Sequence, residues 1–176
     1  MKAFGVGLTL SMALAMLPFP AGADPLTTWD NVINGPGRFR LLTGFNNAAV
    51  FDRETGLVWD RSPDSVPRTW VEASRFCVQH TVGAGTRLGW RLPSVQELLT
   101  LMDPTRNPPS LPEGNPFTNV QTDFYWSSTT FRENPALAWG AGFENNTTEP
   151  GPRFTTKTAS FLVWCVRTSL PGTETQ

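Results

Sequence analysis

The stretch Thr69-Trp-Val-Glu-Ala-Ser-Arg-Phe-Cys-Val-Gln-His80 decides the fold class, together with Phe161-Leu-Val-Trp-Cys-Val-Arg167 near the other end of the chain. In the first stretch, apolar residues recur every three or four positions, which predicts an amphipathic helix with one buried face. The second stretch is a short run of apolar and aromatic residues, which predicts a buried strand. Helical and strand signals in one chain predict an α+β fold.

Each stretch carries one of the 2 cysteines, Cys77 and Cys165. Since there are no others, they pair with each other or with a cysteine of another chain. Closing a loop of about 90 residues would stabilise the fold by about 4–5 kcal/mol in the chain-entropy model. The alternative is a pair of reactive or metal-binding thiols, but no C-x-x-C or cysteine–histidine spacing supports it. A structural disulfide is therefore predicted.

The N-terminus has the features of a secretory signal peptide. Lys2 supplies a positive charge, residues 4–17 are uncharged and mostly apolar, and Ala21-Gly22-Ala23 offers small residues for cleavage. The apolar run is too short to span a bilayer comfortably. We predict that the signal peptide is 1–23 and that the protein is exported to the periplasm, the cell surface or the medium, where disulfides form. An uncleaved anchor is the alternative.

The remaining chain fits one domain. We assign residues 24–36 to a short leader, 37–168 to the domain and 169–176 to a disordered tail. The formal net charge of −1 gives no field that attracts polyanions, and no basic stripe indicates a nucleic-acid partner. After residue 23 no segment is long and apolar enough for a membrane span. Several of the 7 tryptophans are expected in the core.

Two capping boxes predict where the helices begin. Thr69 with Glu72 begins the first helix and Ser94 with Glu97 begins the second, which Pro104 ends.

Short strands, long loops and turns make up the rest of the domain. The proline-rich segment 104–116 is expected to form a long ordered loop or a mobile flap, and 145–152 a polar connector. The strands expected are 38–42, 48–52, 57–59, 124–129, 137–143, 155–158 and 161–167.

Several short motifs follow one another along the domain. They are Thr55-Gly56-Leu57-Val58-Trp59, Thr69-Trp70 with Glu72-Ala73 and Cys77, Trp90-Arg91-Leu92-Pro93 with Glu97-Leu98, Tyr125-Trp126-Ser127-Ser128-Thr129, Ala138-Trp139 and Cys165-Val166-Arg167. In this order they resemble the Lcl C-terminal domain family, named for the C-terminal region of a collagen-like bacterial adhesin. The resemblance runs from about Phe51 to Arg167. The ordered set is highly specific, although each motif alone is not.

The resemblance implies a fold similar to C-type-lectin-like domains and to the formylglycine-generating enzyme. Such a fold has a mixed, mainly antiparallel sheet, two short helices, long loops and a disulfide, here Cys77 with Cys165, that joins the early helix to the last strand. From the best-known member, the resemblance also implies homotrimers that bind sulfated glycosaminoglycans and support adhesion. This sequence departs from that member because it contains no collagen-like tract and its net charge is slightly negative.

We interpret the motif residues as structural. Trp90 and Trp126 are expected to pack between the sheet and the helices. Arg91 is expected to bind loop carbonyls or a carboxylate such as Glu97, and the two serines after Trp126 to satisfy turn backbone. The full set is Trp59, Trp70, Trp90, Arg91, Pro93, Trp126, Ser127, Ser128 and Trp139.

Carbohydrate or glycosaminoglycan is the leading ligand. Basic side chains in the second half would bind sulfate, because lectin-like folds carry their variable binding loops there. We select Arg132, Arg153 and Lys157. A calcium-dependent sugar site is the alternative, but Glu149-Pro150-Gly151 lacks the third residue that such lectin loops use, so no metal site is predicted. In that alternative, the oxygen ligands of the calcium ion would come from Asp123, Glu144, Asn145, Asn146 and Glu149.

Neither catalysis nor a cofactor is expected. A serine nucleophile needs a base within reach, and the 1 histidine, His80, lies where it can complement the dipole of the first helix. The two cysteines occupy the positions of the structural disulfide, which excludes formylglycine-type oxidation. The prediction is a non-catalytic binding module. A structural or protein-interaction subunit of a cell-surface or periplasmic assembly is the alternative.

Overall fold

The fold is α+β, with mainly antiparallel sheets, two helices and one disulfide, as predicted. The predicted signal peptide 1–23, the leader 24–36 and the tail from residue 170 lie outside the described residues. The structure is a computed structural model and describes residues 37–83, 88–106, 108–144 and 150–169.

The first sheet is built from the N-terminal strands and completed by the last strand. β1 (Phe39–Leu41), β2 (Ala49–Asp52) and β3 (Leu57–Asp60) form an antiparallel meander, and β9 (Val166–Thr168) pairs antiparallel with β3. A short 3-10 helix over Thr43–Phe45 joins β1 to β2. The predicted hairpin and the third strand after it are therefore confirmed.

The Thr55-Gly56-Leu57 motif forms the turn between β2 and β3. The carboxylate of Asp52 accepts a hydrogen bond from the Thr55 hydroxyl, at 2.9 Å, and one from the backbone N–H of Glu54, at 3.1 Å. Gly56 has a φ of 70°, a conformation that glycine adopts without strain. The threonine and glycine of this motif therefore stabilise a tight turn.

Asp52 also holds the edge strand β1 in place. Arg38 donates hydrogen bonds to both carboxylate oxygens of Asp52, at 2.9 and 2.8 Å. The same guanidinium donates to the backbone carbonyl of Thr100 at 2.7 Å and lies 2.9 Å from the carboxylate of Glu54. Arg38 and Asp52 are both buried. Their pair therefore ties the first sheet to the segment around Thr100.

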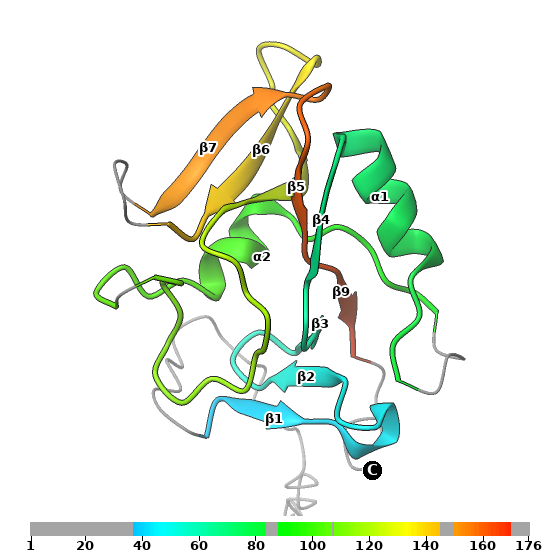
Figure 1. The fold of residues 1–176 in the computed structure, drawn as a ribbon, viewed down its shortest axis with the longest axis vertical. Coiled ribbons are helices and arrows are strands. Elements are labelled where there is room, and N and C mark those ends of the chain that lie inside the picture. The colour runs from blue at the N-terminus through cyan, green and yellow to red at the C-terminus, as the bar shows by residue number, and fades with distance from the viewer. Residues whose placement is uncertain (1–36, 84–87, 107, 145–149, 170–176) are drawn as a thin grey trace, which may run out of the picture.

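The second sheet has the strand order β4-β8-β5-β6-β7. Neighbouring strands are antiparallel except β5 and β8, which are parallel. In Figure 1 the β6–β7 hairpin lies at the top and the β1–β2 hairpin at the bottom. The strands are β4 (Asp64–Arg68), β5 (Phe124–Thr130), β6 (Leu137–Gly142), β7 (Gly151–Thr156) and β8 (Phe161–Val163).

The predicted single strand 161–167 is wrong, because the chain changes sheets within it. β8 ends at Val163 in the second sheet, and β9 begins at Val166 in the first. Trp164 and Cys165 carry the chain between the two, and both are buried. A continuous apolar run reads as one buried strand whether or not it crosses from one sheet to another.

Proline misled two further strand predictions. β7 begins at Gly151, inside the predicted polar connector, and ends at Thr156, before the predicted end of 155–158. Pro152 is accepted there because β7 is an edge strand, in which outward N–H groups have no ladder partner. β4 contains Pro67, is also an edge strand, and was not predicted at all.

Both helices begin at the predicted capping boxes. α1 (Trp70–Gln79) follows Thr69, and α2 (Val95–Thr100) follows Ser94. α2 ends at Thr100, as the prediction that Pro104 ends it implies, because Pro104 has no N–H to donate to the Thr100 carbonyl four residues earlier. That carbonyl accepts a hydrogen bond from the Arg38 guanidinium instead. Within the described residues, no helix combines the length and the apolar character needed to cross a membrane.

Two aromatic-rich clusters form the core. One surrounds the disulfide, and the other lies between α2, the first sheet and β5. The first includes Phe45, Val58, Cys77, Trp90, Phe124, Trp126 and Cys165. The second includes Trp59, Leu98, Leu101, Leu111, Tyr125, Phe143 and Trp164.

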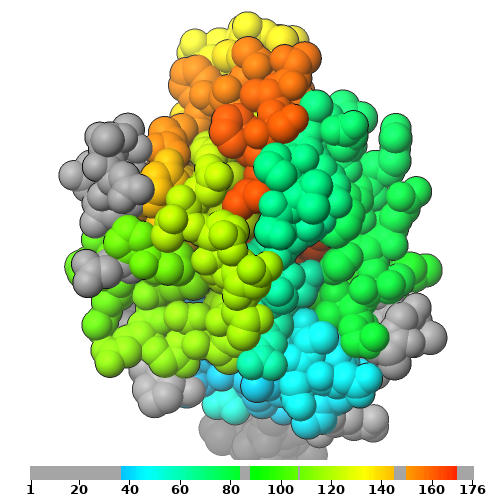
Figure 2. All heavy atoms as spheres, viewed as in Figure 1, coloured from blue at the N-terminus to red at the C-terminus, as the bar shows by residue number. Residues whose placement is uncertain are grey.

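The proline-rich segment covers the second of these clusters. Leu111 is buried in it, and the ring of Phe117, the residue directly after the segment, packs edge-on against Phe39 and Trp164, with centroids 5.2 and 5.0 Å apart. Figure 2 shows the yellow-green chain after residue 108 spread over this face, between the strands above and the β1–β2 hairpin below. The segment was expected to be either a long ordered loop or a mobile flap, and its packing on the core is that of a loop.

Candidate binding site

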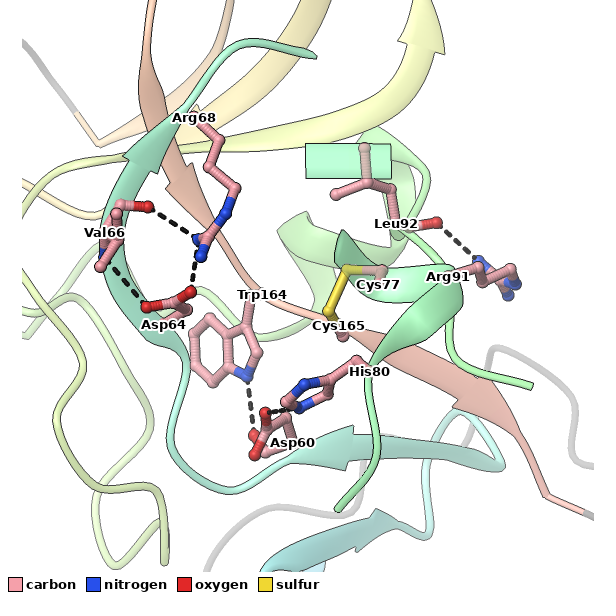
Figure 3. The surroundings of a disulfide bond; sticks show 10 residues. All are labelled: Asp60, Asp64, Val66, Arg68, Cys77, His80, Arg91, Leu92, Trp164 and Cys165. Atoms are coloured by element: carbon pink, nitrogen blue, oxygen red, sulfur yellow. Dashed lines mark hydrogen bonds and ion pairs between the residues drawn. A yellow bond between two sulfur atoms is a disulfide. The ribbon is translucent and has the colours of Figure 1, made fainter. Parts of the chain in front are cut away.

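The disulfide joins α1 to the segment between β8 and β9. Cys77 and Cys165 are bonded, with their Cα atoms 5.4 Å apart. Figure 3 shows the bond between α1 and the chain that carries Trp164. The pairing that the resemblance implied is therefore present within one chain, and both sulfur atoms are consumed in it.

His80, close to this bond, is held by a carboxylate. Its Nε2 lies 2.6 Å from Oδ2 of Asp60, and the indole N–H of Trp164 donates to the Asp60 carbonyl at 2.8 Å (Figure 3). The imidazole also packs against the rings of Phe76 and Trp90. Sequence reasoning placed His80 at the helix end but missed Asp60, which is 20 residues away. The side chain links α1 to β3.

Arg91 fixes the start of α2. Its guanidinium donates to the two carboxylate oxygens of Glu97, at 2.8 and 2.7 Å, and to the Leu92 carbonyl at 3.2 Å. The backbone N–H of Ser94 donates to the same carboxylate. Burial opposes the ionisation of Glu97, but the hydrogen bonds from Arg91 and Ser94 outweigh it and lower the pKa of this carboxyl. The contacts expected for Arg91 are present, so this guanidinium is engaged within the fold.

The Tyr-Trp-Ser-Ser motif binds neighbouring backbone. The Ser127 hydroxyl donates to the Trp139 carbonyl at 2.7 Å, and the Ser128 hydroxyl to the Pro93 carbonyl at 3.2 Å. The indole N–H of Trp126 donates to a backbone carbonyl of β4 at 2.9 Å. Trp126 and Ser127 are fully buried. These contacts join β5 to its surroundings.

Lys157, one of the three predicted ligand residues, lies on the ring of Trp70. Its Nζ is 4.1 Å from the ring centre, within cation–π range, and donates to the Thr130 hydroxyl at 2.9 Å. The Trp70 indole N–H donates in turn to the Ser127 carbonyl. Lys157 therefore fastens the β7–β8 turn to α1 and β5.

Arg153, on β7, lines a pocket of about 190 Å³. Its guanidinium forms an ion pair with Glu144 and lies 5.6 Å from the ring centre of Phe124. The pocket is thus a charged pair set beside aromatic rings. Its lining residues are Asp123, Phe124, Glu144, Arg153, Phe154, Thr155 and Phe161.

Gly142 makes room for this ion pair. A Cβ atom at this position would overlap the Arg153 guanidinium and the Glu144 carboxylate, so a side chain there would displace both. Glycine inside a strand is a signal that another group approaches the backbone closely. The Trp139-Gly-Ala-Gly142 pattern carried this signal, and sequence reasoning did not use it.

The pocket chemistry suits a ligand that carries hydroxyl groups. Guanidinium and carboxylate groups form charge-assisted hydrogen bonds with hydroxyls, and phenyl rings offer apolar surface for C–H groups. The described lining contains two carboxyl groups, of Asp123 and Glu144, and one guanidinium, so its formal charge is about −1. The pocket is therefore less suited to sulfate than to an uncharged group.

A family model for the Lcl C-terminal domain matches residues 48–167, from just before β2 into β9. The chain belongs to this family. No curated protein matches the chain. The disulfide, the Arg91–Glu97 pair and the pocket around Arg153 all lie within the matched region.

In this Lcl C-terminal domain the three predicted ligand residues occupy different surroundings. Arg153 lines the pocket, Lys157 lies on Trp70, and Arg132 is exposed in the turn between β5 and β6. The β6–β7 hairpin and the turns beside it thus carry all three cations, but the pocket holds Arg153 alone of them.

The candidate calcium ligands are only partly described. Asp123 and Glu144 line the same pocket, whereas Asn145, Asn146 and Glu149 lie outside the described residues. Within the ranges that the structure covers, no group of three histidine, cysteine or acidic side chains is placed to hold a metal ion.

Proposed function

We propose that this protein is an exported, non-catalytic binding module, related to adhesin domains, whose ligand is a carbohydrate, glycosaminoglycans included. The observation that carries the proposal is the pocket in which the Arg153–Glu144 pair lies beside Phe124. Membership of the Lcl C-terminal domain family and a disulfide within the chain are compatible with export and with a role in adhesion.

A sugar unit matches the groups that the pocket offers. Its C–H face would lie against the rings of Phe124 and Phe161, and its hydroxyls would reach Arg153, Asp123 and the Thr155 hydroxyl. At about 190 Å³ the pocket is smaller than a typical drug-sized site. It would therefore hold one end or one side group of a longer glycan.

Sulfated glycans would need further cations outside the pocket. Arg132 is exposed, and Lys157, whose ammonium group lies on the Trp70 ring, is half-buried as a residue. Arg132 lies in the turn between β5 and β6 and Lys157 in the turn between β7 and β8. Figure 1 shows both turns at the top, at the start of β6 and the end of β7. A chain bound in the pocket could extend over these turns, with its sulfates near the two side chains.

The histidine, the motif serine Ser127 and the two cysteines are engaged in other contacts, which supports a non-catalytic role. His80 binds Asp60, the Ser127 hydroxyl donates to a backbone carbonyl, and both cysteines form the disulfide. A nucleophile needs a base within hydrogen-bond reach, and none of these groups forms such a pair.

A glycan array tests the proposal. The purified chain is applied to neutral and sulfated glycans at physiological salt, with and without EDTA, beside the Arg153→Ala and Asp123→Asn variants. We expect specific binding that both variants weaken and that EDTA leaves unchanged. A blank array would refute carbohydrate binding, and a signal lost in EDTA would replace the direct contact with a calcium-dependent one.

A protein-interaction role is the second candidate, because apolar side chains are exposed on α1 and β4. Val71 and Val78 lie seven residues apart on α1, and they are 54% and 64% exposed. Val66 on β4 is 55% exposed. Homotrimer formation, which the family resemblance suggests, would also use such a surface. Light scattering of the purified chain and of a Val71→Glu/Val78→Glu variant would report a loss of assembly if this surface is used.

A further inference from the structure

A groove separates α2 from the β6–β7 hairpin on the second sheet. Its volume is about 310 Å³. Figure 1 shows α2 beside the lower ends of these strands. None of the described lining residues carries a charge, in contrast to the pocket around Arg153. They are Val95, Gln96, Leu99, Thr129, Trp139 and Pro152.

Trp139 differs in its hydrogen bonding from Trp70, Trp126 and Trp164, and in its exposure from Trp59, whose unpaired N–H is buried. The indole N–H groups of Trp70, Trp126 and Trp164 donate to backbone carbonyls at 2.8, 2.9 and 2.8 Å. Among the residues that the structure describes, the N–H of Trp139 finds no acceptor and is not buried. An unpaired N–H donor that lines a groove can donate to a ligand, and no hydrogen bond within the protein has to break first.

Gln96 adds a second polar group to the groove. It is exposed on α2, and its amide makes no hydrogen bond with the described part of the chain. The hydroxyl of Thr129 accepts the backbone N–H of Val95 at 3.0 Å, which leaves its own proton available. The groove therefore offers an indole donor from Trp139, an amide donor from Gln96 and the hydroxyl of Thr129.

The indole of Trp139 is held in place by its neighbours. Phe131 and Phe154 stack on each other with centroids 4.2 Å apart, and both contact Trp139 edge-on, at 5.7 and 5.1 Å. Phe154 is nevertheless 46% exposed. Three rings arranged in this way give a rigid aromatic wall, which loses little conformational freedom when a ligand packs on it.

We infer that this groove binds one neutral sugar unit, as a subsite separate from the charged pocket. The inference rests on the proposed carbohydrate-binding function and extends it. The C–H face of the sugar packs on Trp139 and Leu99, and its hydroxyls accept from the Trp139 N–H and pair with Gln96. An ionised group would lose its hydration here without gaining a charged partner. An acyl chain would cover the two donors and leave them unpaired, which costs binding energy.

The test compares two variants that keep the groove wall intact. Trp139→Phe removes the N–H but retains an aromatic ring, and Gln96→Ala removes the amide. Gln79→Ala, on α1, is the matched control because Gln79 is an exposed glutamine outside the groove. Binding of neutral methyl glycosides to the full chain is followed by saturation-transfer NMR and by tryptophan fluorescence, and Tm is measured for each variant.

We expect Trp139→Phe and Gln96→Ala each to weaken the binding of a neutral glycoside by about threefold to tenfold, the value of one hydrogen bond. Gln79→Ala should bind like the wild type. All three variants should keep their Tm within a few degrees.

Other outcomes overturn the inference in distinguishable ways. If glycosides bind and only Arg153→Ala weakens them, the proposed function stands and the groove is not a sugar subsite. If an uncharged detergent binds, no glycoside displaces it, and Trp139→Phe alters its affinity, the groove takes an apolar ligand instead. If glycosides do not bind and the glycan array is blank, the proposed function falls together with the subsite.

Discussion

Arg91 and Glu97 form a pair of parallel hydrogen bonds, 2.8 and 2.7 Å long, at the first turn of α2. The carboxylate also accepts the backbone N–H of Ser94, so that it caps the helix while it holds the arginine. Two family motifs, Trp-Arg-Leu-Pro and Glu-Leu, are thereby joined at one carboxyl group.

The lowered pKa of Glu97 predicts a pH-dependent contribution to stability. Because the folded-state pKa lies below the unfolded one, the contribution is present above the unfolded value, about 4.3, and is lost as the pH falls through the folded value. Glu97→Gln should lower the free energy of unfolding by about 1 kcal/mol at pH 7. In acid, the difference in unfolding free energy between the variant and the wild type should become smaller. Urea denaturation at pH 7, 4 and 3 measures this. Glu133→Gln, at an exposed turn residue, is the control, and a gap that is constant with pH would contradict the prediction.

Removing the disulfide should destabilise the protein strongly. The Cys77→Ala/Cys165→Ala variant should lose about 2–5 kcal/mol, because the bond closes a large loop and both cysteines are buried in the first cluster. The urea midpoints of this variant and of the reduced wild type should agree. Equal midpoints for the variant and the oxidised wild type would mean that the bond adds no stability.

The buried Arg38–Asp52 pair predicts an asymmetry between single and double variants. Arg38→Met leaves the Asp52 carboxylate buried without its cation and should cost about 3–5 kcal/mol. Adding Asp52→Asn to the same chain should recover part of this loss, because the uncompensated charge is gone. Thermal denaturation of the three proteins measures both effects. A double variant less stable than Arg38→Met would contradict the account.

Neutralising Arg132, Arg153 and Lys157 together should abolish binding to sulfated glycans. The triple alanine variant removes the cations of the pocket and of the turns beside it. Elution from a heparin column in a salt gradient is the measurement. A second variant, with alanine at Arg53, Arg75 and Arg106, carries the same change in net charge at other exposed sites and should elute like the wild type. Unchanged elution of the first variant would refute the assignment.

Local signals in the sequence predicted local structure well. The capping boxes at Thr69 and Ser94 and the hairpin before Asp52 are all present, because each depends on residues a few positions apart. The division of 161–167 between two sheets could not be predicted, since nothing in an apolar run tells which sheet each half joins.

The candidate site was predicted less completely than the fold. Arg153 was selected for its charge and position, but its partner Glu144 and the ring of Phe124 come from other strands and loops. Likewise, His80 was visible as a histidine, but Asp60 became its partner only through the packing of α1 on β3. Contacts of this kind depend on tertiary structure, and a single sequence does not reveal them.

The passage of the chain from β8 to β9 through Trp164 and Cys165 has a consequence for the timing of folding. β8 is the strand that connects β4 to β5, and β9 completes the first sheet, so neither sheet is whole until the last segment of the domain has been synthesised. Pairings this distant in sequence form late and slowly. The nascent chain therefore has neither sheet complete, and the disulfide partner of Cys77 is absent, until residues 161–168 have been synthesised.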